Sequence, residues 1–317
     1  AIGPILALHH AEVRVGTCSW TDRTLVRETD WYPRRSMSAA ERLAYYASQF
    51  PVAEADGTYY APPSPELARQ WVERTPPGFR MNVKAYSLLT GHPTRPASLW
   101  PDLRETLSEE DAAKTNVYAH HLTGEAVREA WDRFVGALRP LARAGKLGGV
   151  LLQYPRWFTP KRANRDGLRQ ARERLGELEA YVEFRSPRWL AEPEDRDRTL
   201  GLLSELGFAH VVVDAPAASG LAAVVAVTTP DLAVLRLHGR DDEAWSRPGA
   251  TAAERFRYRY RDTELAELVP AVSTLAEQAR EVHVLANNCY RDDGVRAAGD
   301  LVRLLAPSDG GEVADDR

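Results

Sequence analysis

Short apolar runs recur along the chain, and segments with helical spacing separate most of them. Many of these runs are rich in Val and are only six to eight residues long, which is typical of strands. Eight strands are predicted, at residues 13–18, 52–57, 79–84, 148–153, 180–185, 209–214, 232–239 and 282–288. Helices are predicted at residues 38–49, 64–74, 124–144, 166–178, 195–206, 262–280 and 292–305. Strands that alternate with helices indicate a parallel sheet.

The number of strands favours one architecture. Eight strand–helix units in 317 residues fit a single-domain, TIM-like (β/α)8 barrel, which needs about 250 residues before insertions. An open doubly wound sheet, which more often has five or six strands, is the alternative. Residues 215–231 show little helical pattern, so the sixth helix is expected to be short or missing.

The segments outside this repeat define the expected domain limits. Residues 1–11 are predicted to be a flexible N-terminus, residues 12–306 the barrel, and residues 307–317 a disordered tail. Two long insertions, at residues 86–123 and 240–261, follow the third and seventh strands. Long loops at the carboxyl ends of barrel strands usually carry function, so both insertions are expected to border the site.

The strands also divide into a polar and an apolar face, because side chains alternate along a strand. In the run "YVEFR", Val182 and Phe184 share one face, whereas Glu183 and Arg185 share the other. Since the outer face of a barrel packs under helices, the apolar face is expected outside and the polar face inside. This rule places ten polar residues at the carboxyl-terminal mouth: Glu54, Asp56, Lys84, Gln153, Glu183, Arg185, Asp214, Arg236, His238 and Asn287.

Such a cluster has two interpretations. The polar side chains can form an ion-pair network that only fills the barrel, because single buried pairs are commonly structural. Buried pairs often add no net stability, however, since desolvation offsets much of the Coulomb attraction. Ten polar groups at one opening therefore favour a functional site.

The residue types suggest acid–base chemistry on a charged ligand. Glu183 and Asp214 are predicted to act as general acid and base if their surroundings separate their pKa values. His238 is a candidate proton shuttle, and its alternative role is a barrel histidine bonded to a carboxylate. Four side chains are expected to hold an anionic group such as a carboxylate or phosphate: Lys84, Arg185, Arg236 and His238.

Composition and motifs exclude several classes. The formal charge of -4 lacks the basic footprint of a nucleic-acid binder, so nucleic acid is an unlikely partner. Without a leader-like or membrane-length apolar segment, a cytoplasmic protein is expected. Cys18 and Cys289 end the first and last strands and are predicted to be inert thiols, since no CxxC is present.

No cofactor is predicted, and a divalent ion held by carboxylates and His238 is the alternative. A zinc site with several histidines would require His92, His120 and His121 of the first insertion to fold over the mouth. No residue is assigned as a metal ligand, because no ligand spacing is present.

Several segments along the chain closely resemble the YecE-like family, labelled domain of unknown function 72. They read "GTCSW", "EADGTYYAPP", "WVERTPPGFRMNVKA", "LLQYP", "VEFRSPRW", "DAP", "LRLHG", "YRYRD" and "ANN". The resemblance implies a TIM-like barrel for residues 12–306. It also implies that the family's recurrent polar positions fall on Glu54, Lys84, Gln153, Glu183, Arg185, Asp214, Arg236, His238, Asn287 and Asn288.

The chain departs from that family at two places. Ser186 follows "EFR" where the family often has His, and Gly91 separates Thr90 from His92 where the family has a TH pair. The resemblance therefore carries over no histidine role at either place. The family label does not establish a reaction.

The sequence leaves three functional hypotheses. The first is an enzyme that uses acid–base chemistry on a small polar or anionic metabolite at the mouth, with Glu54, Gln153, Asn287 and Asn288 among the substrate-binding residues. The second is a nucleic-acid phosphodiester or base-processing enzyme, which rests on fold analogy alone. The third is a noncatalytic ligand-binding barrel. No membrane partner is expected.

Overall fold

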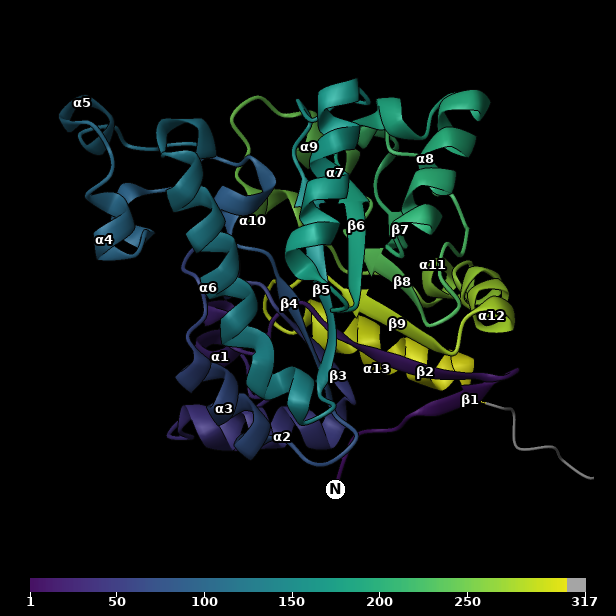
Figure 1. The fold of residues 1–317 in the computed structure, drawn as a ribbon. Helices are drawn as coiled ribbons and strands as arrows, with labels where there is room; N and C mark the ends of the chain where they lie inside the picture. The colour runs from purple at the N-terminus through teal and green to yellow at the C-terminus, as the bar shows by residue number, and fades with distance from the viewer. Residues whose placement is uncertain (307–317) are drawn as a thin grey trace, which may run out of the picture.

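Eight parallel strands, β2 to β9, follow one another around a ring in the computed structural model, which describes residues 1–306 (Figure 1). The ring closes because β2 pairs with β9 over six residues, from Glu12↔Glu281 to Thr17↔Ala286. The closed TIM-like barrel is therefore confirmed and the open sheet excluded. The strands are β1 Leu6–Leu8, β2 Ala11–Thr17, β3 Val52–Ala55, β4 Arg80–Lys84, β5 Leu147–Tyr154, β6 Ala180–Phe184, β7 Ala209–Asp214, β8 Leu232–Leu237 and β9 Glu281–Ala286.

Helices surround the ring and cover its outer face. They are α1 Arg23–Glu28, α2 Ala39–Gln49, α3 Pro65–Arg74, α4 Pro101–Arg104, α5 Glu109–Ala112, α6 Gly124–Arg143, α7 Arg162–Leu175, α8 Pro193–Glu205, α9 Asp242–Ser246, α10 Ala252–Arg255, α11 Asp262–Ala266, α12 Val269–Gln278 and α13 Asp293–Leu305. None of the helices in residues 1–306 combines the length and the apolar character needed to cross a membrane. The predicted tail at residues 307–317 lies outside the described residues.

Two departures from the expected helices have physical causes. The predicted helix at residues 262–280 is two helices, α11 and α12, and Pro270 lies in the first turn of the second. A proline there lacks the N–H that a continuous helix would need. The sixth helix is missing, as predicted: after β7 only the 3-10 turn Ala217–Ser219 forms before β8.

The sequence pattern predicted no strand before residue 13, yet β1 pairs antiparallel with residues 11–13 of β2. β9 occupies the other edge of β2, so β1 takes the edge that faces β3. The ladder between β2 and β3 is consequently short, with Thr17↔Ala53 as its pair. The Tyr46 hydroxyl of α2 bridges this gap, accepting from Thr17 N (2.8 Å) and donating to Val52 O (3.0 Å).

The interior of the barrel is layered. At its amino-terminal base, Glu281 pairs with Arg80 (2.8 Å) and contacts His283 (2.9 Å), and Asn82 donates to His283 Nδ1 (3.0 Å). Above this base lies an apolar belt of Val52, Leu151, Tyr181, Val211, Val234 and Leu285. The polar residues of the mouth lie above the belt.

The first insertion, residues 86–123, contains the 3-10 turns η2 Ser87–Thr90, η3 Pro96–Ser98 and η4 Ala119–His121, together with α4 and α5. Arg133 of α6 donates two hydrogen bonds to Asp102 of α4, at 2.8 and 2.6 Å. This bidentate pair ties the insertion to the barrel's outer helices. The second insertion contains α9 and α10.

Candidate functional site

Arg236 lies at the centre of the mouth and is fully buried. Its Nη1 donates to Glu183 Oε2 at 2.6 Å and its Nη2 donates to Glu54 Oε1 at 2.5 Å. β3, β6 and β8 supply these three side chains, which meet because each points into the barrel from the carboxyl-terminal part of its strand. The guanidinium thus holds two carboxylates in place beneath the opening.

Glu183 collects further partners on its second oxygen. Gln153 Nε2 donates to Oε1 at 3.1 Å, and His238 Nε2 lies 3.0 Å from the same atom. Arg185 Nε lies 2.7 Å away, although its N–H is not aligned for a hydrogen bond. Burial alone would raise the pKa of Glu183, but Arg185, His238 and Arg236 hold it well below the usual range. Glu183 is therefore an ionised, immobilised carboxylate.

His238 is held between two partners. Asn287 Nδ2 donates to its Nδ1 at 2.9 Å, so Nε2 carries the proton that faces Glu183. Burial lowers the pKa of His238 to about 4. The imidazole is consequently neutral at physiological pH, with both ring nitrogens already engaged.

The partly exposed charged groups of the mouth are Asp56, Lys84 and Arg185. Burial raises the pKa of Asp56 to about 8, Glu54 adds to the rise, and Lys84 opposes it. Burial lowers the pKa of Lys84, and Asp56 counteracts this effect. Asp56 therefore carries a proton at neutral pH although a cation lies beside it.

Aromatic side chains line the rim around these groups. Lys84 Nζ lies 4.6 Å from the ring centroid of Tyr59. The guanidinium of Arg185 lies 5.8 Å from the Trp245 ring and 5.6 Å from the Phe256 ring. These cation–π contacts orient both cations without neutralising them.

Most of the sequence-predicted residues meet at the mouth, but Asp214 does not join them. Its register partner Leu237 points outward into the helical shell, and parallel partners share a face. Arg240 Nη2 donates to Asp214 at 2.9 Å and the Tyr260 hydroxyl donates at 2.6 Å. The inward assignment of Asp214 was therefore wrong, and the residue anchors the second insertion.

The reason lies in the missing sixth helix. Val211 and Val213 of β7 face the interior, whereas His210 faces outward. α8 packs against one side of β7, but no helix follows β7, and the irregular segment in its place supplies polar partners: His210 Nε2 lies 2.8 Å from Val224 O. The rule that the outer face is apolar fails where such a segment replaces a helix.

Asn288 also lies outside the central network. It is buried, and its Nδ2 donates to the backbone oxygen of Tyr258 in the second insertion at 2.8 Å. Asn287, by contrast, reaches His238.

Sequence reasoning missed Tyr181 as a contributor to the mouth, gave Asp56 no role and named His92 only as a possible metal ligand. Burial is the main cause of the raised pKa of Asp56, with Glu54 two residues earlier adding to it, and burial becomes visible only in the closed barrel. The Tyr181 hydroxyl donates to Glu54 Oε2 from the apolar belt. His92 lies near Lys84 and Arg185, where burial and both charges lower its pKa to about 3. The intervening Gly91 still allows Thr90 Oγ1 to lie 2.9 Å from His92 Nδ1.

One group of side chains has the spacing of a metal site. Ligand atoms of Cys18, Glu54 and Asp56 lie within 4.8 Å of one another. Arg236 Nη2 already donates to Glu54 and lies 3.5 Å from Cys18 Sγ. Burial raises the pKa of the Cys18 thiol well above its usual value, so the neutral thiol is a poor ligand. The guanidinium occupies the place that a cation would need.

Comparisons with known proteins cover nearly the whole chain. A family model described as "Protein of unknown function DUF72" matches residues 14–315. The UPF0759 protein YunF of Bacillus subtilis (strain 168) is 28% identical over 298 residues, which cover 92% of this chain and 94% of the relative.

Solved structures give the same result. A crystal structure of a DUF72 family protein from Enterococcus faecalis V583 has a TM-score of 0.75 and 26% identity, covering 94% of this chain and 97% of that one. A DUF72 family protein from Thermotoga maritima MSB8 has a TM-score of 0.71 and 28% identity, covering 92% and 98%. The likeness includes the entire barrel.

Proposed function

The chain belongs to the DUF72 protein family, and we propose that it is an enzyme that uses acid–base chemistry on a small anionic metabolite at the barrel mouth. The family description assigns no reaction, so the proposal rests on the chemistry of the mouth. Carboxyl-terminal mouths are where TIM-barrel enzymes place their active sites.

Asp56 is the observation that carries the proposal. A general acid works best when its pKa lies near the operating pH, and the pKa of Asp56 is raised to about 8. Its side chain is 26% exposed, so a ligand at the mouth can reach the carboxyl group. We assign Asp56 as the proton donor to an oxygen of the substrate that develops negative charge; its carboxylate then recovers the proton from water.

Lys84 and Arg185 are the groups that would bind the substrate. With Asp56 protonated and His238 neutral, three cations of the mouth (Lys84, Arg185 and Arg236) face two ionised carboxylates (Glu54 and Glu183). Arg236 is enclosed by both carboxylates, so the excess positive charge lies toward the opening. A carboxylate or phosphate group of the substrate would complete the balance.

Glu183 and His238 take a positioning role in this proposal in place of a catalytic one. Both side chains are fully buried, and each polar atom that they offer already has a partner. Glu183 fixes Arg185 and Arg236, and His238 fixes Glu183 through the hydrogen bond from Asn287. Such a preorganised support keeps the charges aligned without rearrangement during reaction.

The test uses a panel of small carboxylates and phosphate esters, with binding followed by calorimetry and turnover by proton NMR. Asp56→Asn is expected to retain binding and to lose at least a hundredfold in turnover. Lys84→Met is expected to weaken binding at least tenfold. Lys161→Met, an exposed lysine at the start of α7, is the matched control and should change neither.

Two results would count against the proposal. Turnover that persists in Asp56→Asn would remove this residue as the acid. Tight binding of a panel member without turnover in the wild type would favour the noncatalytic ligand-binding barrel.

A further inference from the structure

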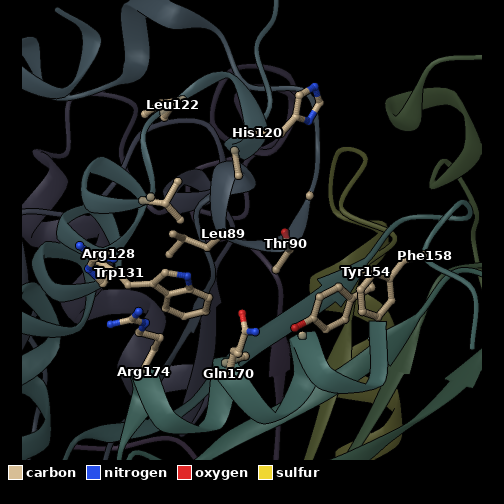
Figure 2. Close-up of a pocket in the computed structure, with 16 residues that line it drawn as sticks. Leu89, Thr90, His120, Leu122, Arg128, Trp131, Tyr154, Phe158, Gln170 and Arg174 are labelled. Carbon is tan, nitrogen blue, oxygen red and sulfur yellow. The ribbon is translucent and has the colours of Figure 1, made fainter. Parts of the chain in front are cut away.

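A cavity of about 500 Å³ lies outside the barrel, where the first insertion meets α6 and α7. Figure 2 shows its lining, in which Leu89 and His120 come from the insertion, Trp131 from α6 and Gln170 from α7. The volume falls within the range of small-molecule sites. The mouth residues are absent from its lining, so the cavity is a separate feature of the molecule.

Two buried aromatic side chains line this cavity with unused hydrogen-bond donors. Trp131 is 8% exposed and Tyr154 is 4% exposed, but within residues 1–306 neither the Trp131 indole N–H nor the Tyr154 hydroxyl bonds to a protein group. Trp189, by comparison, donates its indole N–H to Phe158 O at 2.6 Å. Neither donor atom is among the fully buried side-chain atoms without a partner, so water reaches both, and each can exchange that water for a polar atom of a ligand in the cavity.

The other walls define what that ligand is. Leu89, Leu122 and Phe158 present apolar surface, and the Phe158 ring stacks on the Tyr154 ring with centroids 4.1 Å apart. Arg128 and Arg174 line the same cavity, and within the described part of the chain neither forms an ion pair. In the view of Figure 2 both arginines lie beside Trp131, on the side away from Tyr154 and Phe158.

We propose that this cavity, bounded by α6, α7 and the first insertion, is a binding site for a small organic anion with a flat apolar body. The ring system packs against Trp131, Phe158 and the leucines, where it removes apolar surface from water. The acidic group pairs with Arg128 and Arg174, whose charges are otherwise uncompensated. The hydroxyl of Tyr154 and the indole N–H of Trp131 donate to polar atoms of the ligand.

The probe is 1-naphthoate, and 1-naphthalenemethanol is its uncharged counterpart. Isothermal calorimetry is expected to show one naphthoate per chain and binding of the alcohol at least tenfold weaker. The double variant Arg128→Glu/Arg174→Glu should weaken naphthoate binding at least tenfold, and Tyr154→Phe about fivefold. Arg139→Glu is the matched control, because this exposed arginine lies about three turns further along α6 and is not part of the cavity lining.

NMR locates the probe independently of the arginine variants. The side-chain indole resonance of Trp131, assigned with Trp131→Phe, should shift on addition of naphthoate to the wild type. Lys84→Met, which alters the barrel mouth, should leave the affinity unchanged.

Four outcomes would overturn the assignment. The first is that naphthoate does not bind to the wild type, and the second is that Arg139→Glu loses as much naphthoate affinity as the double variant. The third is a loss of naphthoate affinity in Lys84→Met that the cavity variants do not share, and the fourth is that the wild type binds the alcohol as tightly as naphthoate. A Trp131 resonance that does not move at saturating naphthoate would overturn it as well.

Discussion

Removing Arg236 tests whether the mouth is held together by its central guanidinium. Arg236→Met keeps much of the side-chain volume but takes the charge away from two fully buried carboxylates. Glu183 would retain Arg185, His238 and Gln153. Glu54 would keep the Tyr181 hydroxyl, its neighbour Asp56 and the charge of Lys84, but no directly paired cation. The larger part of the destabilisation should therefore arise at Glu54.

Breaking a buried ion pair by removing one partner costs about 3–5 kcal/mol, because the other charge stays buried without compensation. We expect Arg236→Met to lower the free energy of unfolding at pH 7 by that amount. Neutralising the stranded group should restore part of it, so the double variant Arg236→Met/Glu54→Gln is expected to recover about 2 kcal/mol. Urea unfolding followed by circular dichroism measures both changes.

The same experiment has a predicted pH dependence. In the wild type the pKa values of Glu54 and Glu183 are lowered. Their stabilising contribution is therefore present above the unfolded carboxyl pKa of about 4.3 and is lost as the pH falls below it. Without Arg236, burial would raise the pKa of Glu54 instead, so the variant should gain stability as the pH falls from that raised value toward the unfolded one. The gap between the two proteins should narrow from pH 7 to pH 4.

Arg169→Met is the matched control, because Arg169 makes an exposed pair with Glu205 at 3.5 Å. Its urea midpoint should stay close to that of the wild type. Two results would refute the argument that Arg236 compensates buried charge. One is a urea midpoint of Arg236→Met that is equally unchanged. The other is a loss in the free energy of unfolding that depends neither on pH nor on the added Glu54→Gln substitution.

Three other substitutions test separate parts of the structure. The free energy of unfolding of Asp56→Asn should exceed that of the wild type, by a difference that widens from pH 5 to pH 8. The reason is that the folded pKa of Asp56 is about 8, so the wild type loses stability as the pH rises toward and through that value. A difference in free energy that stays constant with pH would contradict the raised pKa. Tyr46→Phe should cost about 1–3 kcal/mol and speed exchange of the Thr17 amide, because that buried N–H loses its acceptor; unchanged exchange would argue against the bridge. Asp214→Asn should lower the melting temperature by weakening the contact to Arg240 and leave the carbon-13 carboxyl titration of Asp56 unaltered, whereas a shifted titration would place Asp214 back at the mouth.

Much of the barrel could be predicted because its strands encode their two faces. In "FRMNVK" and "YVEFR" the apolar and polar positions alternate, and the structure places Met81 and Val182 under the helices. The run "AHVVVD" carries three consecutive valines, so its hydrophobic pattern fits either orientation. Register with β6 and β8 decides it, and register depends on pairing that a single sequence does not contain.

The mouth was predictable as a collection of residues but not as a set of roles. Glu183 and Asp56 look alike in sequence, since each is an acidic residue at an inward-facing position near the carboxyl end of a predicted strand. Their pKa values move in opposite directions because Arg185, Arg236 and His238 surround Glu183, whereas Glu54 lies beside Asp56. The neighbours two residues away, Arg185 for Glu183 and Glu54 for Asp56, can be read from the sequence, but the burial of both carboxyl groups and the charge that Arg236 adds from another strand cannot.

The belt of aliphatic and aromatic side chains across the barrel interior separates two charged assemblies that the same eight strands carry. The ionic contacts at the base, around Glu281 and Arg80, do not pass through the belt to Arg236. The residues at the opening can thus vary independently of the contacts at the base. Substitutions among the upper side chains would leave the ionic contacts of the lower layer, and with them that end of the scaffold, intact.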